Sequence, residues 1–335
     1  MLKKILFLLL AVTMVAGASL AVELNGAGAT FPFPIYSKWI SEYYKATNDK
    51  INYQPIGSGG GIRQFTNGIV DFGASDAPMT NQEIKAAGGD VLHIPTVMGA
   101  VAVSYNLPGI NSLKLDDQTL AKIFLGDIKK WNDEAIVKLN PGINLPDKSI
   151  LTAHRSDGSG TTNIFSNYLA KVSSAWAAQV GAGKSLNWPV GVGGKGNAGV
   201  AGVIKVNEGA IGYVELAYAI TNDLSVVVLK NRSGKFVTPS IDSTVAAAAG
   251  AIKSIPNDFR ADLTNAKGAN AYPIIGLTWL LVHKNQSNAE KGKTLVEFLK
   301  WSLTVGQKYG PELYYAPLPE ELKTKVLETI DSIKY

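Results

Sequence analysis

The sequence predicts an α/β fold in which helices cover largely parallel sheets. Two observations lead to this prediction. At four places a strand-like stretch runs through small residues into a helix-like segment, and apolar side chains behind these junctions recur at three- and four-residue spacing, as in helices packed on a sheet. The junctions lie at residues 24–31, 51–61, 69–78 and 155–162. Because ligands of such folds bind at the carboxyl ends of strands, we expect the four junctions to converge on one ligand.

The first 21 residues have the three parts of a secretory signal peptide. Lys3 and Lys4 precede an apolar run over residues 5–15, and small residues that suit cleavage after Ala18 or Ala21 follow it. The alternative is an N-terminal membrane anchor, which the shortness of the apolar run disfavours. We therefore expect a signal peptide over residues 1–21 and export of the mature protein.

The composition excludes several classes of function. The 335 residues, of which 46% are hydrophobic, suffice for two domains of ordinary size. The formal net charge is +5, and removal of Lys3 and Lys4 leaves +3 (5 − 2). The basic residues are scattered, so a nucleic-acid surface has little support. The absence of cysteine excludes disulfides, thiol catalysis, cysteine-based metal sites and a lipid-modified cysteine.

Helices are expected behind the first three junctions. Pro32 suits the start of the first helix, and the spacing of Ile62, Phe65 and Ile69 predicts a second helix behind the glycine run. Residues 79–87 form a third candidate. The apolar face of the first helix is predicted to consist of Tyr36, Trp39, Ile40, Tyr43 and Tyr44.

Two long apolar stretches predict buried strands that cross between two domains. They lie at residues 99–105 and 274–282. The first domain would then comprise residues 22–104 and 274–335, including the C-terminal helices after Ala289. The second, residues 105–273, would be inserted between them. Its glycine-rich stretch at residues 188–215 is either a mobile loop or the start of an ordered helix, and a helix is favoured by its apolar residues Val200, Val203, Ile204 and Val206.

The fourth junction, Arg155-Ser-Asp-Gly-Ser-Gly-Thr-Thr162, has the chemistry of an anion site. Glycines and small hydroxyl residues allow backbone N–H groups to point outward, and the N-terminus of the following helix carries partial positive charge. Arg155 can offer a planar, bidentate pair of N–H donors to an oxyanion.

Other kinds of site are less well supported by the residues. The glycine run at residues 57–61 does not end in Gly-Lys-Ser/Thr, and Gly183-Lys-Ser185 has Ala178 where a nucleotide loop needs glycine. Ser159 lacks the Gly-x-Ser-x-Gly setting of a hydrolase nucleophile. The three histidines lie on separate segments without metal-ligand spacing. Asp76 is either the cap of the helix after Pro78 or a ligand-binding residue.

Five stretches, taken together, resemble one known family. They are GAGATFPFPIYSKW, YQPIGSGGG, VDFGASDAPMT, HRSDGSGTT and YYAPLP. In this order and spacing they resemble the periplasmic phosphate-binding proteins of phosphate-specific ABC transporters, the PstS family. The resemblance extends from about Leu24 to the C-terminal region. It implies a type II, two-lobed periplasmic binding protein fold, with mixed, mostly parallel sheets, helices on both faces and the ligand in the cleft between the lobes.

The resemblance also implies a function. The protein would bind inorganic phosphate with high affinity in the periplasm and deliver it to the permease and ATPase subunits of an ABC importer. It would be a monomer and not an enzyme, without a cofactor, metal or nucleic-acid partner. Two alternatives stay open: a binding protein for another tetrahedral oxyanion such as sulfate, and a secreted phosphatase, for which no nucleophile with a base or metal is visible.

The resemblance assigns the phosphate-binding residues position by position. They are Thr30, Phe31, Ser58, Asp76, Arg155, Ser159, Gly160 and Thr161. Asp157 resembles a partner that supports the arginine. A carboxylate among hydrogen-bond donors suits phosphate on chemical grounds. Hydrogen phosphate carries a proton that needs an acceptor, whereas sulfate has no proton near neutral pH. An unmatched buried polar contact costs about 1–3 kcal/mol, so Asp76 is expected to determine specificity.

Overall fold

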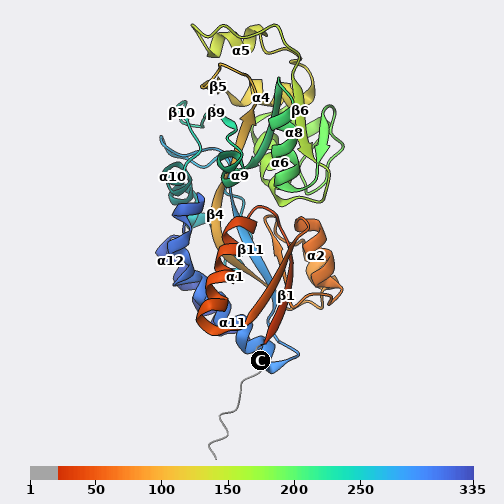
Figure 1. Ribbon diagram of the computed structural model, residues 1–335, viewed down its shortest axis with the longest axis vertical. Coiled ribbons are helices and arrows are strands. Elements are labelled where there is room, and N and C mark those ends of the chain that lie inside the picture. Colours follow the sequence, from red (N-terminus) through yellow and green to blue (C-terminus); the bar gives the residue numbers. More distant parts are fainter. Residues whose placement is uncertain (1–21) are drawn as a thin grey trace, which may run out of the picture.

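The computed structural model describes residues 22–335, and the predicted signal peptide lies outside the described residues. The described chain forms an elongated molecule (Figure 1). Two halves, each with a sheet flanked by helices, follow one another along the long axis. One long strand, β4 (Val91–Tyr105), runs from one half to the other, and the chain returns to the first half at the start of β11 (Ile275–His283).

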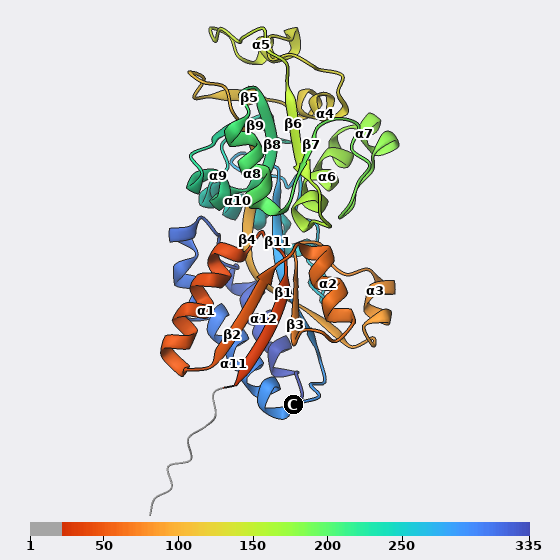
Figure 2. The same cartoon turned by 45° about the vertical axis from the view of Figure 1, so that its right-hand side comes forward.

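The half that contains residue 22 is built on a sheet with one antiparallel strand in an otherwise parallel row. Its elements are β1 (Glu23–Gly28), α1 (Phe33–Thr47), β2 (Lys50–Pro55), α2 (Ser58–Thr66), β3 (Phe72–Ser75), α3 (Asn81–Ala86), β4 (Val91–Tyr105), β11 (Ile275–His283), α11 (Ala289–Leu303) and α12 (Glu320–Asp331). The strand order is β2-β1-β3-β11-β4, and β1 is parallel to both β2 and β3. Helices α1 and α11 lie to one side of these strands and α2 and α3 to the other (Figure 2).

The other half continues the strand order as β4-β8-β6-β7, with a ladder of three short strands beside it. Its elements are β5 (Leu113–Leu115), α4 (Asp117–Leu125), α5 (Glu134–Leu139), β6 (Leu151–Arg155), α6 (Gly160–Val172), α7 (Ser174–Gln179), β7 (Val192–Gly194), α8 (Gly196–Val206), β8 (Ala210–Glu215), α9 (Leu216–Thr221), β9 (Ser225–Lys230), β10 (Phe236–Val237) and α10 (Ile241–Ala251). A short 3-10 helix follows α10 at Ile252–Ser254, and two more, at Gly306–Tyr309 and Pro311–Leu313, lie between α11 and α12 of the first half. The predicted mixed α/β architecture is confirmed, and the helix expected in the glycine-rich stretch is α8.

Strand β4 connects the two halves. Its first part, up to Ala100, pairs antiparallel with β11, and its last part, from Val101 to Tyr105, pairs antiparallel with β8. The stretch predicted at residues 99–105 is therefore the end of a longer strand. Strands are present at both predicted stretches, and their nearly unbroken burial explains their continuous apolar sequence.

The second helix differs from its prediction at both ends. The glycine run is part of α2, which begins at Ser58 and ends at Thr66. Gly68 then adopts a positive φ of 65°, a conformation that turns the chain away from a helix. The expectation that Ile69 lies on the helix face is wrong, since its side chain is 64% exposed.

The third helix is shorter than predicted, and Asp76 is not its cap. Helix α3 begins at Asn81 behind Thr80, whose hydroxyl accepts the Glu83 N–H while the Glu83 carboxylate accepts the Thr80 N–H. This reciprocal capping box supplies the partners that a helix start needs. The cap interpretation of Asp76 is therefore wrong, and its carboxylate is available for another role.

The first helix packs on the sheet through the aromatic side chains that the spacing predicts. Tyr36, Trp39 and Tyr43 are buried, and the Trp39 indole N–H donates to the Gly306 carbonyl at 2.7 Å. Ile40 is half-buried, and Tyr44 is exposed at the edge of this face. The bond to Gly306 ties α1 to the segment behind α11 and satisfies the buried indole.

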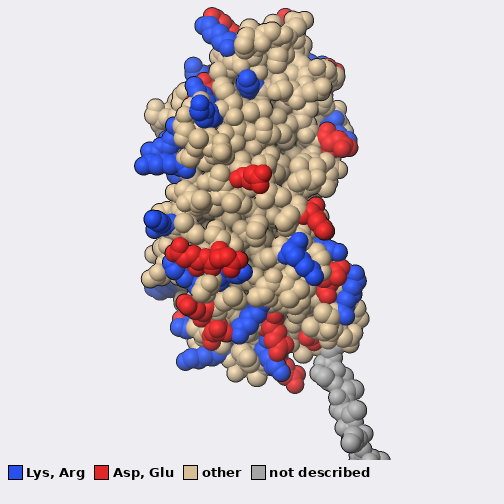
Figure 3. Space-filling model, turned by 90° about the vertical axis from the view of Figure 1, so that its left-hand side faces the viewer, with Lys and Arg blue, Asp and Glu red and all other residues tan. Residues whose placement is uncertain are grey.

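The surface carries mixed charge. Basic and acidic side chains are interspersed over the face shown in Figure 3, as expected from their scatter in the sequence. Within residues 22–335, no helix is both long and apolar enough to span a membrane.

The core of the first half supplies a stability prediction. Leu281 of β11 is fully buried opposite Gly73 of β3 and His93 of β4. We expect Leu281→Ala to lower the free energy of unfolding by about 2–5 kcal/mol, because it removes buried methyl groups and leaves a cavity. Exposed Ile69 is the control, and Ile69→Ala should change it by less than about 0.5 kcal/mol. Urea unfolding measures the free energy of unfolding of both variants. Similar losses in the two variants would contradict the placement of Leu281 in the core.

Candidate functional site

The four junctions meet where the two halves face each other. Thr30 and Phe31 follow β1, Ser58 begins α2, Asp76 follows β3, and Arg155 ends β6. Ser159 is the N-cap of α6, and Gly160 and Thr161 form its first turn. All eight of these residues are buried. The structure thus brings together every residue that the sequence analysis proposed for the ligand site.

Asp76 lies at the centre of the first half's contribution. Its backbone N–H donates to Ser58 Oγ at 3.1 Å, and Thr278 Oγ1 of β11 donates to its Oδ1 at 3.0 Å. The side chain is 2% exposed. Burial raises the pKa of Asp76 to about 7, although the Thr278 hydrogen bond and the Arg155 charge oppose this rise. The carboxyl group can therefore accept or hold a proton near neutral pH.

Gly160 allows the second half to approach this carboxylate. Its N–H donates to Ser58 Oγ at 3.1 Å, which joins α6 to α2 across the boundary between the halves. A Cβ atom at this position would lie 2.6 Å from both Ser58 Oγ and Asp76 Oδ2. Only glycine therefore fits here without displacing the site.

Arg155 is held by Asp157. Its Nε donates to Asp157 Oδ1 at 2.8 Å and its Nη2 to Oδ2 at 2.6 Å, while Nη1 reaches Thr161 Oγ1 at 3.3 Å. Burial alone would raise the pKa of Asp157, but the Arg155 hydrogen bonds and charge bring it below its usual value. The five donors of a guanidinium leave one N–H each on Nη1 and Nη2. A bidentate contact with an oxyanion is thus open only on that edge.

The residues that complete the site were not found from the sequence. The Asn197 side-chain amide donates to Thr30 Oγ1 at 2.9 Å and to Thr161 Oγ1 at 3.2 Å. Tyr218 OH donates to the Thr30 carbonyl at 2.6 Å, and Tyr315 OH to the Phe31 carbonyl at 2.6 Å. Tyr315 belongs to the YYAPLP stretch, which contributed to the family resemblance but was given no role in the site. Asn197 directly follows the glycine that starts α8. Neither stretch has a sequence pattern from which these hydrogen bonds could be predicted.

The histidines do not contribute chemistry to this site. His93 is buried and accepts the Met79 N–H at Nε2, and burial lowers its pKa to about 4. His154 stacks on Trp188 and His283 on Phe65. Within residues 22–335, no group of three metal-ligating side chains could hold a metal ion.

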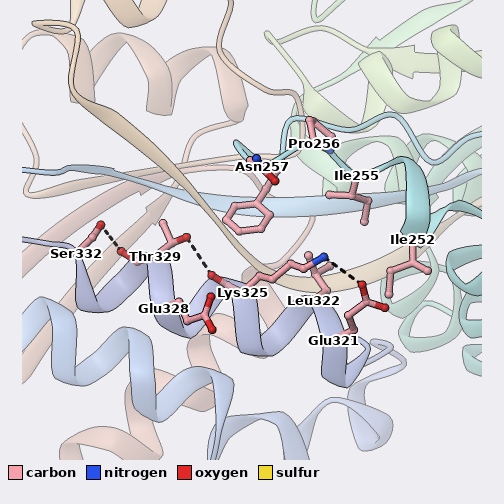
Figure 4. A pocket seen from close by; sticks show the side chains of 11 residues that line it. Ile252, Ile255, Pro256, Asn257, Glu321, Leu322, Lys325, Glu328, Thr329 and Ser332 are labelled. Carbon is pink, nitrogen blue, oxygen red and sulfur yellow. Dashed lines mark hydrogen bonds and ion pairs between the residues drawn. The ribbon is translucent and has the colours of Figure 1, made fainter.

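A separate groove of about 460 Å³ lies between the segment after α10 and helix α12 (Figure 4). Its lining combines apolar Ile252, Ile255 and Leu322 with the charged side chains of Glu321 and Lys325. The groove contains none of the predicted ligand residues. Those residues are buried where the two halves meet, so the halves are closed over the proposed ligand site.

Comparison with known proteins identifies the family. Residues 15–304 match a family model described as a PBP superfamily domain. The chain is 48% identical over 308 residues to the phosphate-binding protein PstS of Xylella fastidiosa strain 9a5c, which covers 91% of this chain and 84% of the relative. The chain belongs to the PstS family. The PstS of Pasteurella multocida strain Pm70 is 46% identical, over 97% of this chain and 95% of the relative.

Solved structures agree with the fold of a PstS family member. The phosphate-bound periplasmic phosphate-binding protein PfluDING superposes with a TM-score of 0.72 at 22% identity, over 91% of this chain and 93% of that chain. A phosphate-binding protein from Stenotrophomonas maltophilia gives 0.67 at 19% identity, over 92% and 94%. At these identities the likeness shows the fold alone, and it confirms the periplasmic binding protein fold that the resemblance implied.

The raised pKa of Asp76 predicts how the stability of this PstS family member depends on pH. Between the ordinary aspartate pKa of 3.8 and about 7, the folded protein holds a proton that the unfolded chain has lost. The stabilisation is therefore complete below pH 3.8 and is lost as the pH rises through 7, by at most about 1.4 kcal/mol per pH unit.

Urea unfolding in phosphate-free buffer from pH 4.5 to 8 tests this dependence. Burial also raises the pKa of Glu215, so Glu215 contributes to the pH dependence of both proteins. The contribution of Asp76 is therefore read from the difference in unfolding free energy between wild type and Asp76→Asn, in which Glu215 is unchanged. We expect Asp76→Asn to gain stability relative to wild type as the pH rises. Parallel stability curves for the two proteins would contradict the assigned pKa.

Proposed function

We propose that this protein binds inorganic phosphate between its two halves and delivers it to an ABC importer. The observation that carries the proposal is a buried carboxylate among hydrogen-bond donors, namely Asp76 facing Ser58, Gly160 and the Arg155 side of the site. Phosphate offers several acceptor oxygens and one proton, which is the pattern that complements these groups.

Each predicted ligand residue receives a role in this proposal. Thr30, Ser58, Ser159 and Thr161 donate from hydroxyl groups, Phe31 and Gly160 from backbone N–H groups, and Arg155 from its remaining Nη1 and Nη2 protons. Asp76 accepts the proton of phosphate. Asp157 holds the guanidinium in place through its two hydrogen bonds and offsets its charge.

Closure of the halves would exclude water from the ligand. We propose residues 22–104 with 274–335 as one lobe and residues 105–273 as the other, with β4 and β11 as connections. Contacts between these lobes support the closed arrangement: the Gly59 N–H donates to the Gly158 carbonyl at 2.8 Å, and Lys184 pairs with Glu83 at 2.6 Å. A desolvated site strengthens charge-assisted hydrogen bonds.

The alternatives are weaker. The chain is a binding protein and not an enzyme, because it belongs to a family of binding proteins, so the phosphatase alternative is set aside. Sulfate would place an unprotonated oxygen against an ionised Asp76 carboxylate inside a dry site, which is a repulsive contact, whereas hydrogen phosphate brings its own proton.

The partners and location follow from the family and the N-terminus. The relatives are named phosphate-binding proteins PstS, and residues 1–21 have the pattern of a cleavable signal peptide. We propose that the mature protein works as a monomer in the periplasm, where it meets the membrane permease that its ATPase drives.

Calorimetric titration with phosphate and sulfate tests the selectivity. We expect wild type to bind phosphate, and to gain about 2.7 kcal/mol of stability at a hundredfold excess over Kd, with little effect of sulfate. Asp76→Asn removes the repulsive charge while keeping the shape, so the ratio of phosphate to sulfate affinity should fall by about 5- to 150-fold, from the 1–3 kcal/mol cost of an unmatched buried contact. An unchanged ratio would mean that Asp76 does not determine the selectivity for phosphate over sulfate. Absence of phosphate binding by wild type would refute the proposed function.

Arg155→Ala tests the charged donor. The substitution removes the ligand's charge-assisted contact and leaves Asp157 without its partner, so we expect phosphate binding to weaken by about 3 kcal/mol, or roughly a hundredfold. Arg155→Lys should recover only part of this, since a lysine lacks the planar pair of donors. Exposed Arg232, in the turn between β9 and β10, is the matched control, and Arg232→Ala should bind like wild type. A folded Arg155→Ala protein with full affinity would contradict the role.

A further inference from the structure

The direction of the hydroxyl protons in the site depends on their neighbours. A hydroxyl has one proton and two acceptor positions, so two incoming N–H groups force its proton to point elsewhere. Thr30 Oγ1 accepts both the backbone N–H of Asn197 at 3.1 Å and its side-chain amide at 2.9 Å. The Thr30 proton is therefore directed away from Asn197.

Thr161 has the same arrangement. Its Oγ1 accepts the second amide proton of Asn197 at 3.2 Å and a guanidinium N–H of Arg155 at 3.3 Å. Ser58 differs, because both N–H groups that reach its Oγ, from Asp76 and Gly160, belong to the backbone. One side chain, that of Asn197, thus contacts the hydroxyls of both threonines.

We propose that Asn197 is a positioning residue that turns the hydroxyl protons of Thr30 and Thr161 toward the bound anion. This inference rests on the proposed phosphate function, which it deepens by naming what makes the two threonines donors. Asn197 itself does not need to touch the ligand.

The orientation of the Asn197 amide is fixed by a third contact. Its Oδ1 accepts the Glu215 N–H at 2.9 Å, and the residue is fully buried. The flipped amide would place NH2 against that N–H and its oxygen against Thr30 and Thr161. The amide nitrogen therefore faces the threonines, and α8 holds it there as the residue after Gly196.

The same contact links donor orientation to closure. Thr30 follows β1 in one half, whereas Asn197 and Thr161 belong to α8 and α6 of the other. Thr30 acquires its two N–H partners only when the halves meet. Closure therefore converts a freely rotating hydroxyl into a fixed donor, and the entropy of fixing it is part of the cost of closure.

A double-mutant cycle on phosphate affinity tests the proposal. Asn197→Leu has a similar shape and removes the amide without adding charge. If Asn197 acts through the two threonines, Asn197→Leu should raise the phosphate Kd by about 5- to 100-fold in the wild-type background. In a Thr30→Val, Thr161→Val background, which has no hydroxyls to orient, the same substitution should raise Kd by less than about 2-fold.

A control variant separates this role from a structural one. Asn140→Leu replaces another buried asparagine, whose amide donates to the Lys114 and Ile136 carbonyls far from the site, and it should lower the ligand-free melting temperature without changing Kd. If Asn197→Leu fails to fold, Asn197→Ala takes its place in the cycle, because it removes the amide without adding a group that hydrogen-bonds to the threonines.

The outcomes are distinct. Wild type that binds phosphate, with a large effect of Asn197→Leu that disappears without the threonine hydroxyls, supports the proposal. Wild type that binds phosphate, with an effect that persists undiminished in the valine background, overturns the role of Asn197 and leaves the proposed function intact. Absence of phosphate binding by wild type overturns both.

Discussion

Burial of the Asp76 carboxylate at the boundary between the halves is the constraint on which the site depends. A buried carboxylate without partners is costly, and Thr278, the Ser58 loop and the Arg155 charge reduce that cost only in part, so its pKa rises to about 7. In the proposed site, an ionised Asp76 accepts the proton that hydrogen phosphate brings. One hydrogen bond then forms between the two groups and repulsion is avoided. Gly160 is required by the same constraint, because any larger residue would collide with Asp76.

The sheet explains why the carboxylate lies at this position. β1 and β3 are parallel neighbours, so the residues after them leave the sheet at the same edge. β11 returns antiparallel beside β3, with Trp279 opposite Ser75, and this register places Thr278 against Asp76. β4 then carries the chain past this edge into the second sheet. The strands that join the halves thus also form the boundary at which the ligand residues meet.

Much of the fold and of the candidate site could be predicted because the signals for it lie in short stretches of sequence. Periodic apolar residues and glycine-rich junctions are local signals, and they predicted the strand–loop–helix units, the two long buried strands and the junctions that meet between the halves. The end of α2 was missed because Ile69 continues the apolar spacing beyond the Gly68 turn. Thr278 and Asn197 were missed for a different reason. Thr278 is separated from Asp76 by 202 residues, and Asn197 from Thr30 by 167, so only the assembled sheets bring each pair together.

The charges of the site show what kind of anion recognition this is. Arg155 carries the positive charge, but Asp157 neutralises it through two hydrogen bonds, and Asp76 adds a further acid. The binding residues taken together are therefore not cationic, and general attraction of anions cannot account for their selectivity. Attraction must come from oriented dipoles, namely hydroxyl and backbone N–H groups whose directions the fold fixes. In the proposed site, a tetrahedral anion that matches those directions and supplies one proton gains every contact, whereas an anion of the same size and charge without the proton meets an ionised Asp76 without a hydrogen bond.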